Sequence, residues 1–180
     1  MKKNEILADA PLVNRVANSS LITINLEEFY PSKEFITFDI KDFLFQGLIL
    51  KEKDFRTALK ELDWSQYEDK IVLLYCSTDA ILPVWSYMLV SAYLAPLTDQ
   101  IFQGNKTDFL KHHYKQTIAD MDLSIHAEKR VVIKGCSDKE VPPSAYLDLT
   151  KSLQPFAQSI MYGEPCSTVP IFKRPRKLKK

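Results

Sequence analysis

The chain has 180 residues, of which 46% are hydrophobic and 26% are charged. This composition is typical of a folded globular protein and excludes an intrinsically disordered chain. The formal net charge is +1, but six of the 24 basic residues lie in the last eight positions, KRPRKLKK. The rest of the chain is mildly acidic, with 18 Lys and Arg against 23 Asp and Glu. The basic terminus could touch nucleic acid, but such a terminus is more often a solvated tail, so a nucleic-acid partner is not expected.

We expect one domain over residues 1–172, followed by a solvated basic tail at 173–180. The N-terminus, MKKNEILADAP, lacks the sustained apolar stretch of a secretory signal. Residues 80–98 carry no charge, but Pro83 and Pro96 bracket a helix of only about 20 Å, shorter than the roughly 30 Å hydrocarbon core. The three cysteines are not closely paired, which fits a reducing compartment. We therefore expect a cytoplasmic protein without a membrane partner.

The elements expected before residue 50 are strands. In residues 1–40, LITINLEEF and FITFDI favour an edge strand or a hairpin, and FLFQG at 43–47 favours a short strand that ends at a glycine. Further along the chain, helices alternate with strands, with Asp54 as the expected N-cap of the first helix. The expected elements follow one another at 55–62, 71–76, 83–95, 101–104, 108–119, 130–135, 143–154 and 159–163.

An internal repeat relates residues 55–104 to residues 114–163 by a gap-free shift of 59 positions. Eleven of the 50 aligned pairs are identical, whereas about three are expected from composition alone. The identical pairs include Asp79/Asp138, Pro83/Pro142 and Gly104/Gly163. The repeat indicates that the same order of helices and strands occurs twice.

Strands that alternate with helices and are apolar across their whole width indicate a parallel sheet covered on both faces. Right-handed crossovers then predict an α/β fold, a three-layer doubly wound, mostly parallel sheet built from an internal β-α-β-α duplication. In such sheets ligands bind at the carboxyl edge, where the strands end and the following loops begin.

Helix 83–95 carries no charge, whereas its counterpart, helix 143–154, has a polar face with Asp148 and Lys151. A helix that is apolar all round is normally buried all round. The expected cover is either the N-terminal segment or a second subunit. A homodimer would use the large side chains of this helix, Trp85, Tyr87, Met88 and Tyr93.

Each of the three cysteines is followed by a serine. The first two pairs lie where predicted strands end, and the third follows the last predicted strand. Because these positions share the carboxyl edge of the expected sheet, they predict a site there. Its candidate residues are Cys76, Ser77, Asp79, Cys136, Ser137, Asp138 and Cys166.

Three interpretations of the cysteines remain open. In the first, Cys76, Cys136 and Cys166 bind zinc or an iron–sulfur centre, although they lack the close pairs of a typical zinc site. In the second, one of them is a nucleophile or redox thiol. No histidine is placed as its base. His126 lies at the far end of the strand before Cys136, and His112 and His113 lie within a helix. In the third, the cysteines are small buried apolar side chains.

Asp79 and Asp138 occupy matching repeat positions and have two interpretations. An aspartate between a strand and a helix commonly caps that helix, and capping is the simpler explanation. A paired acidic site is the alternative. A nucleotide cofactor is not expected, because the four glycines form neither a GxGxxG nor a Walker pattern.

Four segments resemble the bacterial family catalogued as domain of unknown function 2480. They are NRVANSSLITINLEEFYP, FDIKDFLFQGLILKEKDFR, VVIKGCSDKEVPPSAY and GEPCSTVPI. The resemblance covers nearly the whole chain and implies a bacterial, soluble, single-domain protein. No activity or site residue comes with it. Two functions are therefore left: a thiol, metal or small-molecule site at the sheet edge, or a non-catalytic homodimeric assembly protein that uses helix 83–95.

Overall fold

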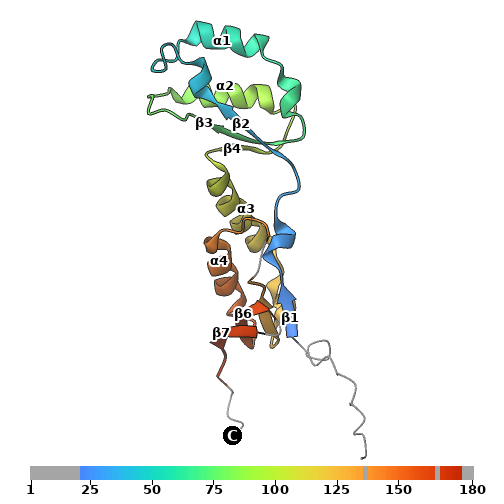
Figure 1. The fold of residues 1–180 in the computed structure, drawn as a ribbon. Helices are drawn as coiled ribbons and strands as arrows, with labels where there is room; N and C mark the ends of the chain where they lie inside the picture. The colour runs from blue at the N-terminus through green and yellow to red at the C-terminus, as the bar shows by residue number, and fades with distance from the viewer. Residues whose placement is uncertain (1–20, 136–137, 165–166, 176–180) are drawn as a thin grey trace, which may run out of the picture.

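A computed structural model of the chain describes residues 21–135, 138–164 and 167–175. The strands form two sheets, which lie one above the other along the length of the molecule (Figure 1). We call residues 35–104, which contain the three-stranded sheet, the upper half. The lower half contains the four-stranded sheet and comprises residues 21–34 with the described residues of 105–175.

The upper half contains a parallel sheet in the order β2-β3-β4. Its strands are β2 (Phe35–Asp39), β3 (Ile71–Tyr75) and β4 (Ile101–Gln103). Two helices cover one face of the sheet (Figure 1), namely α1 (Glu52–Glu61) and α2 (Val84–Leu94). The short 3-10 helices of this half are η2 (Ile40–Phe43) and η3 (Trp64–Tyr67).

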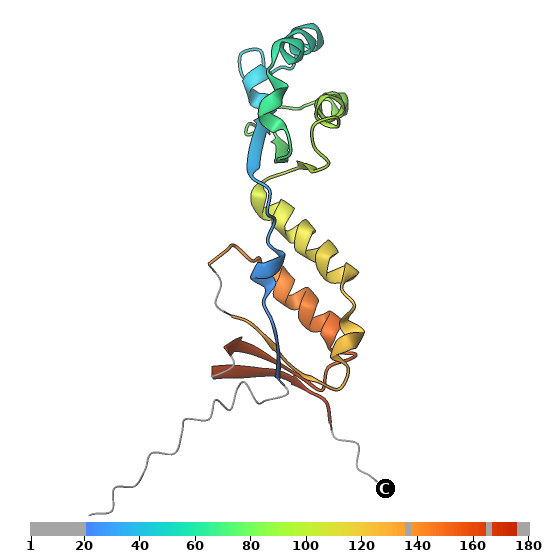
Figure 2. The same cartoon turned by 90° about the vertical axis from the view of Figure 1, so that its right-hand side faces the viewer.

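The lower half contains a sheet in the order β1-β5-β6-β7, in which β7 is antiparallel to its neighbour. Its strands are β1 (Leu21–Ile24), β5 (Arg130–Ile133), β6 (Ser159–Glu164) and β7 (Ser167–Lys173). Two helices run side by side over the sheet (Figure 2), namely α3 (Lys106–Asp120) and α4 (Pro143–Leu153). The 3-10 helices are η1 (Leu26–Phe29) and η4 (Leu123–His126).

The α/β class and the mostly parallel strands are confirmed, but the expected single three-layer sheet is wrong. β5 takes β1 as its parallel partner, with Leu21 opposite Arg130, and does not extend the upper sheet. The chain leaves the upper sheet through α3. Phe109 of this helix packs against Phe35 of β2 and Phe102 of β4, with ring centroids 5.4 and 5.5 Å away. Helix α3 therefore joins the two halves.

Strand β3 is apolar along its whole length because both of its faces are covered. Successive side chains of a strand point to opposite faces. Ile71 and Leu73 accordingly belong to a core shared with α3, α4 and the lower sheet, whereas Val72 and Leu74 belong to the core under α1 and α2. The shared core fixes the upper half against the lower half.

Three local features differ from the sequence-based expectations. Residues 43–47 do not form a strand, because Asp39 caps η2 and the chain then turns, so that Phe45 forms an isolated bridge with Ile49. Helix α1 begins earlier than expected, with Lys51 as N-cap and Asp54 inside its first turn, since the residues between them favour helix. Of the alternatives for residues 1–40, the edge strand is confirmed twice, by β1 and β2 in different sheets.

The two repeat segments contain corresponding elements at corresponding positions. Helices α4 and η4 each begin 59 residues after α2 and η3. Asp69 and Glu128, which are also 59 positions apart, both have positive φ angles, of 54° and 57°. The segments thus share one order of elements, and their origin by duplication stays a prediction.

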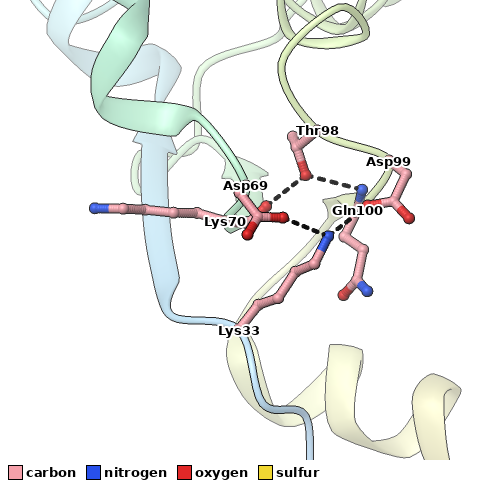
Figure 3. A network of polar contacts seen from close by, with 6 residues as sticks. All are labelled: Lys33, Asp69, Lys70, Thr98, Asp99 and Gln100. Carbon is pink, nitrogen blue, oxygen red and sulfur yellow. Dashed lines mark hydrogen bonds and ion pairs between the residues drawn. The ribbon is translucent and has the colours of Figure 1, made fainter.

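Polar contacts close the amino-terminal edge of the upper sheet (Figure 3). The Lys33 ammonium lies 2.9 Å from Oδ1 of Asp69 and 2.9 Å from Oδ1 of Asp99. Thr98 Oγ1 donates to the Lys70 carbonyl at 2.6 Å and accepts from the Gln100 N–H at 3.1 Å. These contacts tie together the segments that lead into β2, β3 and β4.

Arg174 makes similar contacts in the lower half. Its guanidinium lies 3.4 Å from Oε1 of Glu128 and donates to the carbonyls of Gln154 and Pro155 at 3.2 and 2.6 Å. Lys173 is the last residue of β7. The first residues of the expected tail are therefore anchored to the lower half, and residues 176–180 lie outside the described residues.

Candidate functional site

The two sheets present two separate carboxyl edges. Cys76, Ser77 and Asp79 follow β3 at the edge of the upper sheet, whereas Asp138 follows β5 at the edge of the lower sheet. The structure thus divides these candidates between two edges. Three further candidates lie outside the described residues, namely Cys136, Ser137 and Cys166.

Asp39 organises the upper edge from the end of β2. Its Oδ1 accepts hydrogen bonds from the backbone N–H groups of Lys41 and Ser77, both at 3.0 Å. Burial alone would raise the pKa of Asp39, but the hydrogen bonds from Ser77 and Lys41 outweigh it and hold the pKa below its usual value. This carboxylate is therefore a structural cap that joins η2 to the loop after β3.

The Cys76 thiol lies in packed surroundings at the same edge. The residue is half-buried against the upper core, and its Sγ lies 3.2 Å from Oγ1 of Thr78. The nearby Tyr87 has a raised pKa, first through burial and then through Cys76. Asp79 is exposed. Within the described ranges, no group of three His, Cys, Asp or Glu side chains is arranged to hold a metal ion.

Aromatic rings fill the core behind the upper edge. Trp85 of α2 packs on Phe55 of α1 with centroids 6.2 Å apart, and Trp64 stacks on Tyr93 at 4.9 Å. Such ring pairs stabilise a core beyond the area that they bury. Seven residues join in this cluster, which comprises Phe38, Phe43, Phe55, Trp64, Tyr67, Trp85 and Tyr93.

At the lower edge, Glu27 holds the loop that follows β5. Its Oε1 accepts hydrogen bonds from the backbone N–H groups of Asp138 at 2.6 Å and Lys139 at 2.7 Å. Glu27 belongs to η1, which follows β1, so this carboxylate links the carboxyl ends of two neighbouring strands. Figure 2 shows the short helix and the loop close together beside α3.

The helix caps expected from Asp79 and Asp138 are wrong. The N-caps of α2 and α4 are Pro83 and Pro142, and neither helix has a side-chain cap. In both loops the helix begins only after the proline, whose fixed φ angle suits a helix start. The two aspartates are too early in their loops to reach the free N–H groups of the first turn.

Two buried polar atoms at the lower edge have no hydrogen-bond partner in the part of the chain that the structure describes. They are Oγ of Ser144, in the first turn of α4, and Oε1 of Glu164, the last residue of β6. β5 and β6 are neighbours, with Ile133 opposite Tyr162, so Glu164 ends one of two adjacent strands and Ser144 begins the helix that follows the other. A buried group without a partner costs about 1–3 kcal/mol, and its explanations include strain, a catalytic role and a bound water or ion.

Buried Tyr114 of α3 provides a neutral hydrogen-bond donor at this edge. Its hydroxyl donates to the Leu26 carbonyl at 3.1 Å. Burial raises the pKa of Tyr114 to about 12, with further contributions from the Tyr146 and Tyr30 phenols and the Glu27 carboxylate. The phenol therefore stays protonated at neutral pH. Tyr146, Tyr30 and Glu27 lie near enough to influence its pKa.

Two further tyrosines, Tyr146 and Tyr162, form one wall of the lower edge. The Tyr146 ring of α4 packs edge-on against the Tyr162 ring of β6 at 5.7 Å. The Tyr162 hydroxyl donates to the Gly135 carbonyl at 3.3 Å. A Cβ atom on residue 135 would lie only 2.8 Å from the Tyr162 ring. Glycine is therefore required for the tyrosine to lie across the end of β5.

Ser144, Glu164 and Glu27 were not among the candidates from the sequence. The repeat carried a signal for one of them, because Ser144 aligns with Trp85 at the shift of 59. A large ring in one copy is replaced there by a small hydroxyl in the other. Glu164 lies one residue beyond the repeat, so no comparison pointed to it.

The histidines are placed for packing and hydrogen bonding. His112 is exposed, and Nε2 of His113 lies 2.8 Å from the Phe29 carbonyl oxygen. Burial lowers the pKa of His126, whose Nδ1 is buried and has no partner among the described residues. His126 ends η4, which precedes β5, so it lies at the opposite end of that strand from the carboxyl edge.

Helix α2 is covered by its own half on one side and exposed on the other. Trp85, Tyr87 and Tyr93 pack against the upper core, whereas Met88 is 66% exposed. Beside Met88 the exposed fraction is 75% for Val84, and in the preceding loop it is 95% for Ile81.

None of the described helices, α2 included, combines the length and the apolar character that crossing a bilayer requires.

Comparison with known proteins gives one match. The model of the family described as "Protein of unknown function (DUF2480)" matches residues 10–174, which is most of the chain. The search of curated proteins and the search of solved structures each gave no significant match.

Proposed function

Because the chain belongs to the DUF2480 family, whose description assigns no activity, we propose a function from the geometry of the lower edge. The protein binds a small polar molecule at the carboxyl edge of the four-stranded sheet, in the cytoplasm of a bacterium. The observation that carries this proposal is the pair of buried atoms without a partner in the described chain, Ser144 Oγ and Glu164 Oε1. A ligand that bonds to both would remove the cost of burying them.

The donor and acceptor set indicates the ligand's chemistry. A carboxylate such as Glu164 only accepts hydrogen bonds when it is ionised, whereas the Ser144 hydroxyl both donates and accepts. The complementary molecule therefore presents N–H or O–H groups, as amines, amides and polyols do. The tyrosine wall of Tyr146 and Tyr162 supplies an apolar surface beside these groups, a combination common in small-molecule sites.

Native mass spectrometry tests this function directly. The purified protein is incubated with a bacterial metabolite extract, and its native mass is compared with its denatured mass. We expect an added mass on the wild type that Glu164→Gln and Ser144→Val both lose. Ser86→Ala is the matched control, because Ser86 Oγ in helix α2 already donates to the Pro83 carbonyl at 2.7 Å. An added mass that survives both lower-edge substitutions, or none on the wild type, overturns the proposal.

A thiol or metal version of this site also remains a proposal. Its support is the order of the strands, since the neighbours β5 and β6 precede Cys136 and Cys166 in the sequence. Elemental analysis of the purified protein should then find stoichiometric zinc or iron that Cys136→Ser and Cys166→Ser remove. Cys76 follows a strand of the other sheet, so Cys76→Ser is the control. Absence of metal, together with thiols that resist alkylation, contradicts both versions.

The alternative function is homodimeric assembly through α2, for which Trp85, Tyr87, Met88 and Tyr93 were the interface candidates. The exposed apolar side chains of Ile81, Val84 and Met88 favour it. Light scattering at micromolar concentration should show a dimer that Met88→Asp dissociates without loss of helical signal. A wild-type monomer at that concentration contradicts assembly through this helix.

A further inference from the structure

Two lysines from different segments approach one aromatic ring next to the lower edge. Nζ of Lys106 lies 5.8 Å from the centroid of the Tyr30 ring and 5.4 Å from that of Phe35. Nζ of Lys139 lies 5.5 Å from the same Tyr30 ring. Two ammonium groups that share one ring repel each other, and an anion between or beside them relieves this repulsion.

Both lysines are held in place by the fold. Lys106 is the first residue of α3, whose N-cap Asn105 accepts a hydrogen bond from the Asp108 N–H at 3.0 Å. Lys139 belongs to the loop whose backbone donates to Glu27. The segments after β4 and β5 therefore each bring one cation within 5.8 Å of the centroid of the Tyr30 ring, and the positive end of the α3 dipole adds to their field.

The chain itself already places carboxylates beside these lysines, since Glu27 accepts from the Lys139 N–H and Glu140 pairs with Lys106. Oε2 of Glu140 lies 3.4 Å from Nζ of Lys106, and the two side chains are 50% and 43% exposed. Hydrogen bonding to the Tyr30 phenol, and next to Glu140, raises the pKa of Lys106 even though burial opposes this, so the lysine is fully charged at neutral pH. Half-exposed ion pairs contribute only about 0–1 kcal/mol, so an anion of higher charge can displace Glu140.

We propose that Lys106 and Lys139 form a binding site for the carboxylate or phosphate group of a small anion, and that Glu140 occupies this site in the free protein. The site lies where α3 begins, and it is independent of the Ser144 and Glu164 groups. Glu140 acts as a built-in competitor, which sets a minimum charge that a ligand needs in order to bind.

Amide NMR titrations at low salt test this site with two probes, inorganic phosphate and citrate, which distinguish phosphate from carboxylate. We expect shifts at the start of α3 and in the loop around residue 139. Removing the competitor with Glu140→Gln should strengthen binding about two- to fivefold, the effect of losing one exposed ion pair. The double substitution Lys106→Met and Lys139→Met should weaken it by about tenfold or more, as loss of roughly 1.4 kcal/mol implies.

The control removes an ion pair of similar exposure from the upper half. Nε of Arg56 lies 2.9 Å from Oε1 of Glu52, and Glu52→Gln should leave both titrations unchanged. Wild-type affinity in the double lysine variant, or shifts confined to other regions, overturns the site. Unchanged affinity in Glu140→Gln overturns the role of Glu140 as its occupant.

Discussion

The upper and lower halves share one order of elements, to which the lower half adds β7, but their cores differ in chemistry. The upper core is a cluster of stacked aromatic rings. The lower half instead contains all three of the buried side-chain atoms that have no partner in the described residues, in His126, Ser144 and Glu164. Two of these align with aromatic residues, His126 with Tyr67 and Ser144 with Trp85. One half is thus a packed frame, and the other half has kept polar groups at a cost in stability, as binding sites do.

The largest effect is expected from the aromatic frame. Trp85→Ala removes a partly buried ring that packs on Phe55, and we expect a loss of about 3 kcal/mol, the lower end of the range for a tryptophan in a core. Chemical denaturation followed by circular dichroism should show this loss as a lower midpoint. A loss below about 1 kcal/mol would show that the ring is not part of the packed core, and the contrast between the halves would disappear.

Asp39→Asn should reduce stability in a manner that depends on pH. The pKa of Asp39 is lowered in the folded protein from its ordinary 3.8, so the ionised form contributes stability above pH 4 that is lost as the pH falls through the folded-state pKa. We expect a loss of about 2 kcal/mol at pH 7, typical of hydrogen bonds to a charged group. Denaturation midpoints of wild type and variant should converge in acid, and a gap independent of pH contradicts this role.

Ser144→Ala and Ser86→Ala should change stability in opposite directions. Ser144 Oγ has no partner within the described chain, so its removal should stabilise the ligand-free protein by about 1 kcal/mol. Ser86 is fully buried and its Oγ donates to the Pro83 carbonyl, so its removal should destabilise by about 1 kcal/mol. The melting temperatures of both variants, compared with that of the wild type, show the direction of each change in stability. If both substitutions destabilise, the polar character of the lower edge has another explanation.

The smallest effect is expected from Lys33→Met at the amino-terminal edge of the upper sheet (Figure 3). The substitution removes both ion pairs, to Asp69 and Asp99, whose carboxylates are exposed. Screened surface pairs contribute little. We expect a slightly lower melting temperature at low salt and none of this difference at high salt. A large loss that persists in salt would show that Lys33 stabilises the frame by packing.

Much of the fold followed from the sequence because periodicity and breaker residues determine local structure. The prolines at 83 and 142 mark the starts of α2 and α4, and the apolar runs became β3 and β5. The division into two sheets did not follow. Whether β5 pairs with β4 or with β1 depends on contacts between residues more than 100 positions apart, and local patterns contain no such information.

The location of the candidate site stays a prediction. The carboxyl edge of a parallel sheet remains the proposed location, as the position of Asp138 suggested. Neither Asp79 nor Asp138 caps a helix as expected, because the helices begin at prolines later in each loop. Ser144 and Glu164 became candidates only through burial, which depends on tertiary packing. A serine in a helix has no distinctive sequence pattern. Only the alignment of the two repeat segments shows that Ser144 stands where the other segment has the large ring of Trp85.

The pairing of β1 with β5 also determines the order in which the molecule can fold. The strands β2 and β3 are close in the sequence, since Phe35 pairs with Ile71. In β1, by contrast, Leu21 pairs with Arg130, 109 positions later. Closing the longer loop costs more chain entropy and slows folding. During synthesis the upper half can therefore form first, with β1 waiting unpaired until β5 leaves the ribosome. Pulse-labelled hydrogen exchange should accordingly protect β3 before β1, so that the lower edge, and any binding there, arises only on a nearly complete chain.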